Sequence, residues 1–232
     1  MFIVDDRRTT SSVGHLKFEV IIPPLPKYEI ACKFIAEVFN DTYHATIDPR
    51  PDAIVFCERS NIDNGGVPRA CAGLTFGFAH ERLFSEQYFD DSIQEVLERT
   101  GKYTVERNEI VEIGSLASRQ VAAAAGLICV LPIIAWFLGM RAILCTTTAG
   151  LRKLLAYHHI PFVPLTEAHP ERLPEGERWG NYYENSPLVG IIPLQECTHL
   201  FKNHCGRFVF ANLAGIGIKP VPHTIGYQEV EA

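Results

Sequence analysis

The segment NEIVEIGSLASRQVAAAAG, residues 108–126, contains a run of strand-forming residues with a glutamate, Glu112, in its middle. Strand-forming residues predict a buried central strand over 108–117, followed by a loop of small residues and an apolar helix. A carboxylate that is partly removed from water has a raised pKa and suits proton transfer. Glu112 is therefore a candidate general base. The alternative is a glutamate that pairs with an arginine or caps a neighbouring strand.

A second carboxylate, Glu86, lies in the segment LFSEQY. It is a candidate substrate-binding residue, and so is the nearby Tyr88. A glutamate directly after Ser85 also has a structural explanation, because acidic residues in the first turn of a helix match the helix dipole.

Aromatic residues gather in the segment WGNYYENSP at 179–187. Tyr182 is a candidate catalytic residue, because its hydroxyl can donate a proton to a leaving group. Trp179 and Tyr183 are candidate substrate-binding residues that could line a pocket. Plain packing of adjacent rings explains the same pattern.

The segment CTHLFKNHC contains four residues of zinc-ligand type, Cys197, His199, His204 and Cys205. Their spacing matches no common zinc site, so we predict no metal. The chain also lacks a G-x-S-x-G motif, which disfavours a lipase. No G-x-G-x-x-G follows a strand, which disfavours a dinucleotide cofactor.

Length and charge limit the function further. The chain has 232 residues and a net charge of -6, with no run of lysine or arginine. Nucleic-acid binding needs a basic surface and is not expected. The N-terminus lacks the pattern of a secretory signal peptide. The seven cysteines are scattered and odd in number, which favours reduced, buried thiols and a cytoplasmic location.

The longest apolar run covers residues 122–140 and approaches the ~20 residues of a membrane span. It contains Pro132 and two glycines, and strand-like segments flank it. We therefore expect a helix buried on most of its faces and no stable membrane insertion.

Hydrophobic periodicity and turn residues predict alternating strands and helices. Strands are expected at 16–24, 52–59, 69–79, 108–117, 141–148 and 161–165, and two apolar segments follow at 188–194 and 206–218. Helices are expected at 27–43, 85–101, 121–139 (bent or interrupted at Pro132) and 149–160. This order predicts an α/β fold with a mixed central sheet, helices on both faces and an antiparallel hairpin at 52–79.

Four ordered motifs give the chain a family resemblance. RLFSEQYFDDSIQEVLE, IVEIGSLAS, LRKLLAYHHIPFVPL and RWGNYYENSPLV resemble the thermostable hemolysin family over roughly residues 27–192. The element order is that of the GNAT acyltransferase superfamily. The resemblance implies a GNAT-like sheet, mostly antiparallel, in which two parallel strands splay apart around an acyl thioester. A family name taken from lysis and a fold of acyl-donor users imply different functions.

The same region is more distantly similar to acyl-homoserine-lactone synthases, which carry a Trp-Glu-x-x-Arg-Phe segment on the central strand. Glu112 falls on that glutamate, and Ser115 falls where the arginine would be. This resemblance implies that Glu112 is the base and makes Ser115 a further catalytic candidate.

The resemblance also implies where the acyl donor lies. Backbone N–H groups of residues 114–117, namely Gly114, Ser115, Leu116 and Ala117, would polarise the thioester carbonyl. Arg119 and Gln120 precede the helix whose N-terminus would hold the donor phosphate. Alanines stand where the superfamily has phosphate-binding glycines. A carrier-protein phosphopantetheine donor is therefore at least as plausible as CoA, and Arg119 could equally be a solvated residue.

Two further donor contacts are expected at the end of the strand 141–148 and in the helix that follows it. A hydroxyl among Thr146, Thr147 and Thr148 could reach the pantetheine amides, and Thr147 is our candidate. A helix N-cap is the simpler role for such a threonine. Arg152 could bind the donor phosphate or lie on the helix surface.

The sequence predicts a flexible arm at 1–15, one acyltransferase domain at 16–194 and an extension at 195–232 that packs on this domain. The expected activity is transfer of an acyl group, of fatty-acyl type, from acyl-CoA or an acyl carrier protein, to a small amino-acid-like amine. The helices at 121–139 and 85–99 would wall the acyl chain. No cofactor would be tightly bound. The alternatives are a membrane-active lytic protein and a non-catalytic module that binds an acyl carrier.

Overall fold

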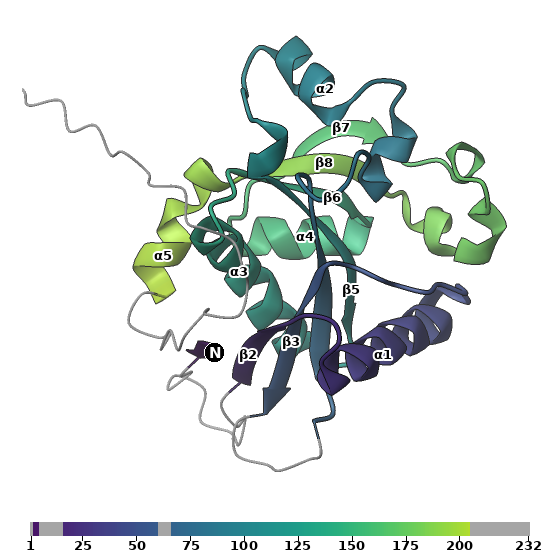
Figure 1. The fold of residues 1–232 in the computed structure, drawn as a ribbon, viewed down its shortest axis with the longest axis vertical. Helices are drawn as coiled ribbons and strands as arrows, with labels where there is room; N and C mark the ends of the chain where they lie inside the picture. The colour runs from purple at the N-terminus through teal and green to yellow at the C-terminus, as the bar shows by residue number, and fades with distance from the viewer. Residues whose placement is uncertain (1, 5–15, 60–65, 205–232) are drawn as a thin grey trace, which may run out of the picture.

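The computed structural model describes residues 2–4, 16–59 and 66–204, drawn in colour in Figure 1. The strands are β1 (Phe2–Val4), β2 (Leu16–Ile21), β3 (Ala53–Arg59), β4 (Ala70–Phe76), β5 (Ile110–Ser118), β6 (Ala142–Thr147), β7 (Val163–Glu167) and β8 (Leu188–Pro193). The α-helices are α1 (Pro26–Tyr43), α2 (Ile93–Thr100), α3 (Val121–Phe137), α4 (Ala149–Tyr157) and α5 (Thr198–His204). Short 3₁₀ helices are η1 (Phe84–Tyr88), η2 (Arg107–Glu109), η3 (Pro170–Arg172), η4 (Gly176–Trp179), η5 (Tyr182–Asn185) and η6 (Leu194–Cys197).

The described strands form one eight-stranded sheet in the order β1-β2-β3-β4-β5-β6-β8-β7. Its neighbouring strands are antiparallel except β5 and β6, which are parallel. Both strands of the parallel pair have interior positions in the sheet, and α3 supplies the crossover between them. The predicted mixed, mostly antiparallel GNAT-like sheet is confirmed.

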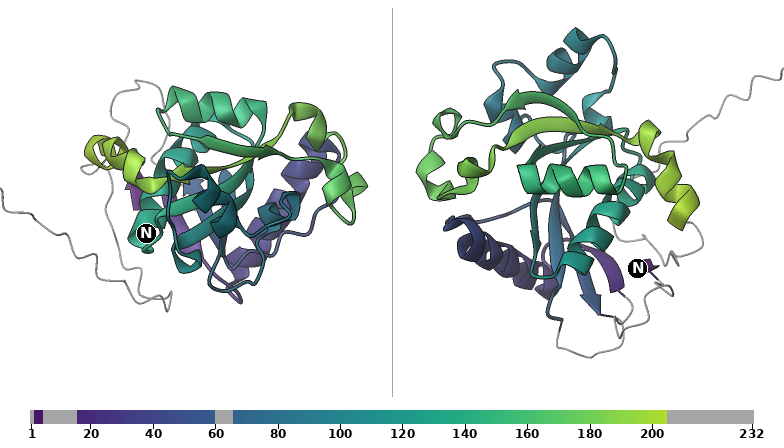
Figure 2. Two further views of the ribbon diagram at one scale, coloured as in Figure 1. Left: turned by 90° about the horizontal axis from the view of Figure 1, so that it is seen from above. Right: turned by 180° about the vertical axis from the view of Figure 1, so that it is seen from behind.

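Helices cover both faces of this sheet. In the view from behind, α3 and α4 lie in front of the strands (Figure 2). They share a core cluster with the side chains of Val111, Ile113, Ile143 and Cys145. The opposite face carries α1 over one half and η1 with α2 over the other. Alternation along β5 therefore turns Glu112 toward the face of α1 and η1.

The parallel strands separate soon after they begin to pair. Their register joins Ile110 to Ala142, Val111 to Ile143 and Glu112 to Leu144, and it ends there. Both strands continue beyond this point, β5 to Ser118 and β6 to Thr147. The result is a V-shaped opening with Glu112 at its apex.

A β-bulge shapes the β5 side of the opening. Cys71 pairs with Ala117 and Gly73 pairs with Gly114, so β5 has one residue more than β4 over this interval. Ser115 lies in the bulge with a φ of 53°, in the left-handed region. A bulge leaves its extra residue outside the ladder and turns the strand locally.

Most predicted elements have their counterparts at nearby boundaries, including the 52–79 hairpin, now β3 and β4. The helix predicted at 85–101 is wrong in its first half. That segment forms η1, then a break, and only then α2, which begins after the N-cap Ser92 and ends at Gly101. Ser92 accepts a hydrogen bond from the Glu95 N–H, whereas Ser85 donates its backbone N–H to the side chain of Glu112 on β5.

The predicted apolar helix is present as α3. It continues through Pro132 without interruption, and its central residues are buried. Among the described helices, none combines the length and apolarity that a membrane span requires. Six cysteines in the described part of the chain are free and buried, as predicted, and Cys205 lies outside it.

The predicted N-terminal arm lies outside the described residues apart from β1. In the predicted extension, residues 195–204 belong to η6 and α5, and the ring of Phe201 lies 5.7 Å from that of Trp136 in α3. The apolar segment at 206–218 also lies outside the described residues.

Candidate functional site

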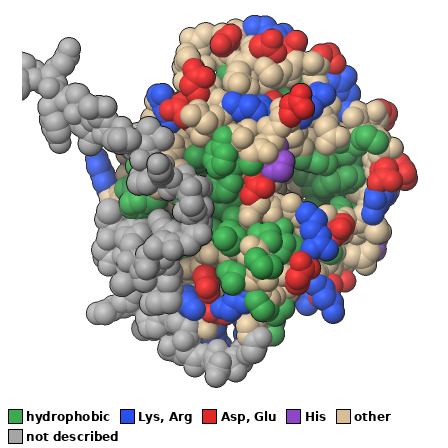
Figure 3. All heavy atoms as spheres, viewed as in Figure 1, with side chains coloured by type: hydrophobic (Ala, Val, Ile, Leu, Met, Phe, Trp, Pro, Cys, Tyr) green, Lys and Arg blue, Asp and Glu red, His purple; other side chains and the backbone are tan. Residues whose placement is uncertain are grey.

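A cavity of about 850 Å³ lies between the separating strands. Its lining comes from β4, β5, β6, β8, η1, α1, α3, α4, the loop at 46–51 and the segment at 173–182. Figure 3 shows hydrophobic side chains at a hollow on the face of the molecule, between α1 and this last segment. The volume is that of a site for a small molecule or a cofactor.

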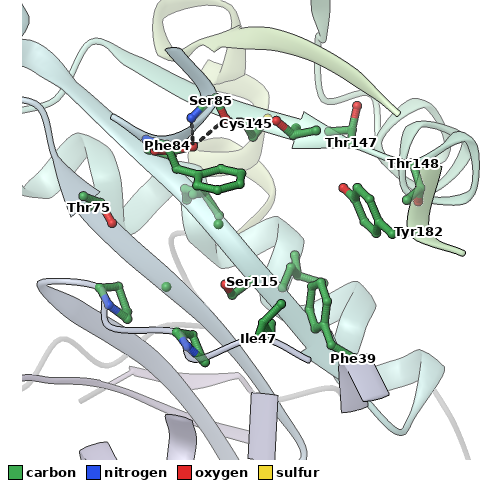
Figure 4. Close-up of a pocket in the computed structure, with 18 of the residues that line it drawn as sticks. Phe39, Ile47, Thr75, Phe84, Ser85, Ser115, Cys145, Thr147, Thr148 and Tyr182 are labelled. Carbon is green, nitrogen blue, oxygen red and sulfur yellow. Dashed lines mark hydrogen bonds between the residues drawn. The ribbon is translucent and has the colours of Figure 1, made fainter. Parts of the chain in front are cut away.

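Glu112 lies at the inner end of the cavity and is 4% exposed. Its Oε2 accepts a hydrogen bond of 2.7 Å from the N–H of Phe84. Its Oε1 accepts one of 2.9 Å from the N–H of Ser85 and another from the Ser85 hydroxyl. Figure 4 shows these contacts as dashed lines beside Ser85. The carboxylate thus binds the first residues of η1.

Two opposing effects act on the pKa of Glu112. Burial, the larger one, raises the pKa above its ordinary value of 4.5. The hydrogen bonds from Ser85 and Phe84 lower it, because they favour the charged form. A carboxylate that lines a cavity and has a raised pKa is a candidate for proton transfer.

The Ser85 hydroxyl contacts a third polar group. Its Oγ lies 2.9 Å from Oγ1 of Thr146, which comes from β6 on the other side of the opening. Thr146 is partly exposed and lines the cavity. Ser85, in contrast, is only 1% exposed.

Aromatic side chains form the outer wall of the cavity. Trp179 and Tyr182 both line it, and their ring centroids are 5.3 Å apart. Tyr182 also packs against Phe39 and Tyr43 of α1, and its hydroxyl points toward the cavity in Figure 4. Burial raises the pKa of Tyr182, so the phenol stays protonated and its O–H can donate a hydrogen bond.

Tyr88 and Tyr183, both predicted to bind substrate, meet each other. Their hydroxyl oxygens are 2.7 Å apart. Tyr88 lines the cavity, whereas Tyr183 stands behind it among the residues packed on two core clusters. Tyr183 thus contacts a cavity-lining side chain without lining the cavity itself.

The end of the cavity on the far face of the sheet is apolar. Its lining there includes Ile128, Leu131 and Pro132 of α3 and Leu151 and Leu155 of α4. The cavity therefore passes through the sheet, from the polar apex near Glu112 to an apolar end. The predicted role of α3 as a wall fits this lining. The wall expected from helix 85–99 is instead made by η1, because the cavity lining contains no residue of α2.

The predicted donor-binding residues divide into two groups. Gly114, Ser115 and Leu116 line the cavity. Ala117 is buried in the core under α1. Arg119 pairs with acidic side chains of α1, and Gln120 is an exposed N-cap of α3 without a side-chain cap. Neither residue lines the cavity, so the placement gives no support to a donor contact from either one.

The threonines at the end of β6 and directly after it have distinct roles. Thr147 lines the cavity, but its hydroxyl donates to the carbonyl of Leu188 at 3.3 Å. Thr148 is the N-cap of α4, which was the simpler alternative for this group. Arg152 donates to the Thr147 carbonyl at 2.5 Å and therefore stabilises the end of β6 rather than the cavity.

Glu86 is bound within the protein and is absent from the cavity lining. Its Oε2 accepts the N–H of Leu83 at 2.6 Å, and its Oε1 accepts the N–H of Ile93 at 2.9 Å. Arg107 contacts both oxygens, at 2.9 and 3.0 Å. These contacts lower the pKa of Glu86 against the effect of burial. Glu86 fixes η1 to the start of α2, which is a structural role.

The sequence did not single out Phe84 and Ser85 as site residues, nor Thr146 as a partner of Ser85. The only local signal was the position of Ser85 before an acidic residue, which suggested a helix cap. Among the described residues, no group of histidine, cysteine and acidic side chains could hold a metal. Cys205 of the zinc-type segment lies outside the described residues.

Solved structures with a similar fold include acyl-homoserine lactone synthases and an N-acyl amino acid synthase. The acyl-homoserine lactone synthase BjaI, solved with SAM and isopentyl-CoA, has a TM-score of 0.56 and 11% identity, covering 81% of this chain and 89% of its own. FeeM, an N-acyl amino acid synthase from uncultured soil microbes, has a TM-score of 0.54 and 11% identity, covering 80% and 93%. The AHL synthase LasI has a TM-score of 0.52 and 12% identity, covering 78% and 91%. At these identities the likeness shows the fold.

No curated protein matches the sequence. The profile described as thermostable hemolysin matches residues 24–198, which include every strand from β3 to β8 and the whole cavity lining. The chain therefore belongs to the thermostable hemolysin family.

Proposed function

We propose that the protein is an N-acyltransferase. It moves an acyl group, of fatty-acyl type, from a CoA or acyl-carrier-protein thioester to the amine of a small amino-acid-like acceptor. One observation carries the proposal: a buried carboxylate lies where two parallel strands separate, in a cavity whose far end is apolar.

The apolar end of the cavity supports a fatty-acyl substrate. Ile128, Leu131 and Leu155 offer an acyl chain an environment without charges. Each buried CH₂ group contributes about 0.8 kcal/mol, so a chain of several carbons gains several kcal/mol there. Solved relatives in fold include an enzyme bound to isopentyl-CoA and an N-acyl amino acid synthase.

Glu112 serves as the general base in this proposal. The acceptor amine needs to lose a proton as its nitrogen attacks the thioester carbonyl. Backbone N–H groups of the bulge around Ser115 bind the developing oxyanion, since a bulge frees groups from the ladder. Tyr182, protonated and directed into the cavity, gives a proton to the departing thiolate.

The residues before α3 bear on the class of acyl donor. Arg119 is engaged with α1, and Gln120 does not line the cavity, so the usual diphosphate cradle lacks side-chain support. This favours a phosphopantetheine arm with one phosphate, carried by an acyl carrier protein. CoA is the second donor class to test.

The experiment is a transfer assay with short, medium and long acyl chains on CoA and on acyl carrier protein, against pooled amino-acid amines. Mass spectrometry detects the N-acyl product. Glu112→Gln should lower the rate by about 10² to 10⁴-fold, as loss of a general base does. The matched control is Glu98→Gln, an exposed glutamate on α2.

Donor binding has its own optical probe. The chain has two tryptophans, and only Trp179 lines the cavity. A Trp136→Phe variant leaves Trp179 as the single reporter, and its fluorescence should change when acyl donor is added. If the protein binds a donor but transfers no acyl group from any donor, the result would favour a non-catalytic binding module over an enzyme. Liposome leakage that survives Glu112→Gln, with no donor binding, would favour the lytic alternative.

A further inference from the structure

We infer that Thr146 and Ser85 carry the proton of the acceptor amine to Glu112. Thr146 is then the catalytic residue that touches the amine, and Ser85 is the link between Thr146 and the carboxylate. The inference rests on the proposed function, because it adds a proton path to the acyl transfer proposed there.

The three side chains Thr146, Ser85 and Glu112 form a chain of hydrogen bonds in which each hydroxyl can donate in only one direction. The Glu112 carboxylate can only accept, so the Ser85 hydroxyl donates its proton to Oε1 of Glu112. The oxygen of Ser85 is then the acceptor in its 2.9 Å contact with Oγ1 of Thr146. Thr146 donates to Ser85 and keeps a lone pair free for a proton from the cavity.

Access to the carboxylate itself is restricted. Oε2 of Glu112 already accepts from Phe84, and Oε1 accepts twice from Ser85. Ser85 and Glu112 are 1% and 4% exposed, and Thr146 is the most exposed of the three hydrogen-bonded side chains. An amine in the cavity therefore reaches the Thr146 hydroxyl more easily than the carboxylate.

The three side chains come from three separate elements. Glu112 lies on β5, Ser85 on η1 and Thr146 on β6. Thr146 comes two residues after Leu144, the last β6 residue that pairs with β5, so it faces the same side as Glu112 across the opening. The chain of hydroxyls thus spans the V where a thioester carbonyl would lie.

The chemical step balances along this path. The amine nitrogen forms a bond to the thioester carbon, and the carbon–sulfur bond breaks. The nitrogen passes one proton to Oγ1 of Thr146, and Thr146 gives its original hydroxyl proton to Oγ of Ser85. Ser85 in turn gives its original hydroxyl proton to Oε1 of Glu112. The thiolate takes a proton from Tyr182, and Glu112 returns the proton it received to Tyr182 through solvent in the open cavity. The products are one amide and one thiol.

The mutational test centres on Thr146, because its partial exposure makes its replacement less disruptive than that of Ser85. Thr146→Val keeps the shape and removes the hydroxyl, and kcat should fall by about 10² to 10³-fold with the donor KM within twofold. Thr146→Ser restores a hydroxyl and should recover kcat to within about fivefold of the wild type. Thr146→Val with unchanged kcat would overturn the inference.

A matched control comes from the next strands of the sheet. Thr146 and Thr166 both lie opposite Val189 of β8, on its two sides. Thr166 does not line the cavity. Thr166→Val removes the same group from the same row of the sheet and should leave kcat and KM unchanged.

Infrared titration of Glu112 tests the chain without turnover. The difference between wild type and Glu112→Gln identifies the carboxyl band of Glu112. Thr146→Val weakens the hydrogen bond that Ser85 gives to the carboxylate, so the midpoint of this band should move to higher pH. Thr166→Val should not move it.

The two assays separate the possible failures. If the wild type transfers no acyl group from any donor, the proposed function fails. The role of the Thr146–Ser85–Glu112 hydrogen bonds in acyl transfer then fails with it. An unmoved infrared midpoint in Thr146→Val overturns the hydrogen-bond chain itself, whatever the activity. Transfer by the wild type with an equally active Thr146→Val leaves the enzyme proposal intact and removes only the proton path.

Discussion

Glu112 of β5 and Leu144 of β6 form the last pair in the parallel register, so the carboxylate lies at the point where the two strands part. The position has two consequences. On one side of it the sheet is closed and buried, and on the other side the strands enclose a cavity. A charged group at this boundary can be held by protein N–H donors and still act on a bound molecule.

Gly114 tests the path of the acyl donor. A Cβ atom at this glycine meets no atom within 4 Å, because it projects into the open space of the cavity. Gly114→Ala should therefore fold with unchanged stability or gain up to about 1 kcal/mol. Its methyl group occupies donor space, so donor affinity should fall by about tenfold, equivalent to about 1.4 kcal/mol.

Urea unfolding and Trp179 fluorescence measure the two effects of Gly114→Ala. Gly126→Ala is the control, since it adds the same methyl group on α3 beside Leu16 and Phe18, outside the cavity lining. Donor affinity in that variant should match the wild type. Equal donor affinity in Gly114→Ala would show that the donor does not pass β5.

The fold was predictable to the extent that local signals agreed. Apolar residues at helical spacing located α1, and apolar runs located α3 and the central strands. The four family motifs, together with the order of the elements, implied the GNAT-like sheet. The segment 85–101 failed because Ser85 and Ser92 are both good helix caps in sequence. The choice between them depends on Glu112, which lies 27 residues from Ser85 and binds its N–H.

The site was predictable only in part for the same reason. Glu112 stood out as a carboxylate in an apolar strand, and Gly114 and Tyr182 followed from their motifs. The contact of Ser85 with Thr146 joins positions 61 residues apart and leaves no periodic trace in the sequence. The sequence offered Arg119 as a phosphate contact, because its partners on α1 cannot be identified from the residues next to it in sequence.

Arg119→Ala distinguishes a surface ion pair from a donor contact. The guanidinium contacts Glu37 and Asp41 and lies 5.5 Å from the ring of Phe34. Exposed pairs of this kind contribute about 1 kcal/mol or less. We expect a stability loss within that range and a donor KM within twofold of the wild type, measured by urea unfolding and steady-state kinetics. A tenfold increase in KM for phosphate-bearing donors would instead place Arg119 at the donor.

Glu86→Gln probes the anchor of η1. In the variant, the partly buried Arg107 loses the carboxylate that neutralises it. This loss should lower the unfolding free energy by about 3 kcal/mol at neutral pH. The folded state lowers the pKa of Glu86. The advantage of the wild type is therefore present above pH 4.5 and declines as the pH falls below that value.

Urea unfolding of Glu86→Gln and wild type at neutral and acidic pH measures this dependence. Glu98→Gln, on the exposed side of α2, should show no comparable loss at either pH. A gap between Glu86→Gln and wild type that stays constant from pH 7 to pH 3 would contradict the ion-pair explanation.

The pH dependence of stability at Glu112 has the opposite sign. Burial raises the pKa of this carboxyl in the folded state, so the folded protein binds the proton more tightly than the unfolded chain. The stabilisation is complete below the ordinary value of 4.5 and is lost as the pH rises through the folded pKa. Glutamine at this position does not titrate. The unfolding free energy of the wild type minus that of Glu112→Gln should therefore fall with rising pH, by at most about 1.4 kcal/mol per pH unit. Urea unfolding of both proteins from pH 4 to pH 9 gives the difference directly, and a difference that rises with pH would show that the three hydrogen bonds to the carboxylate outweigh its burial.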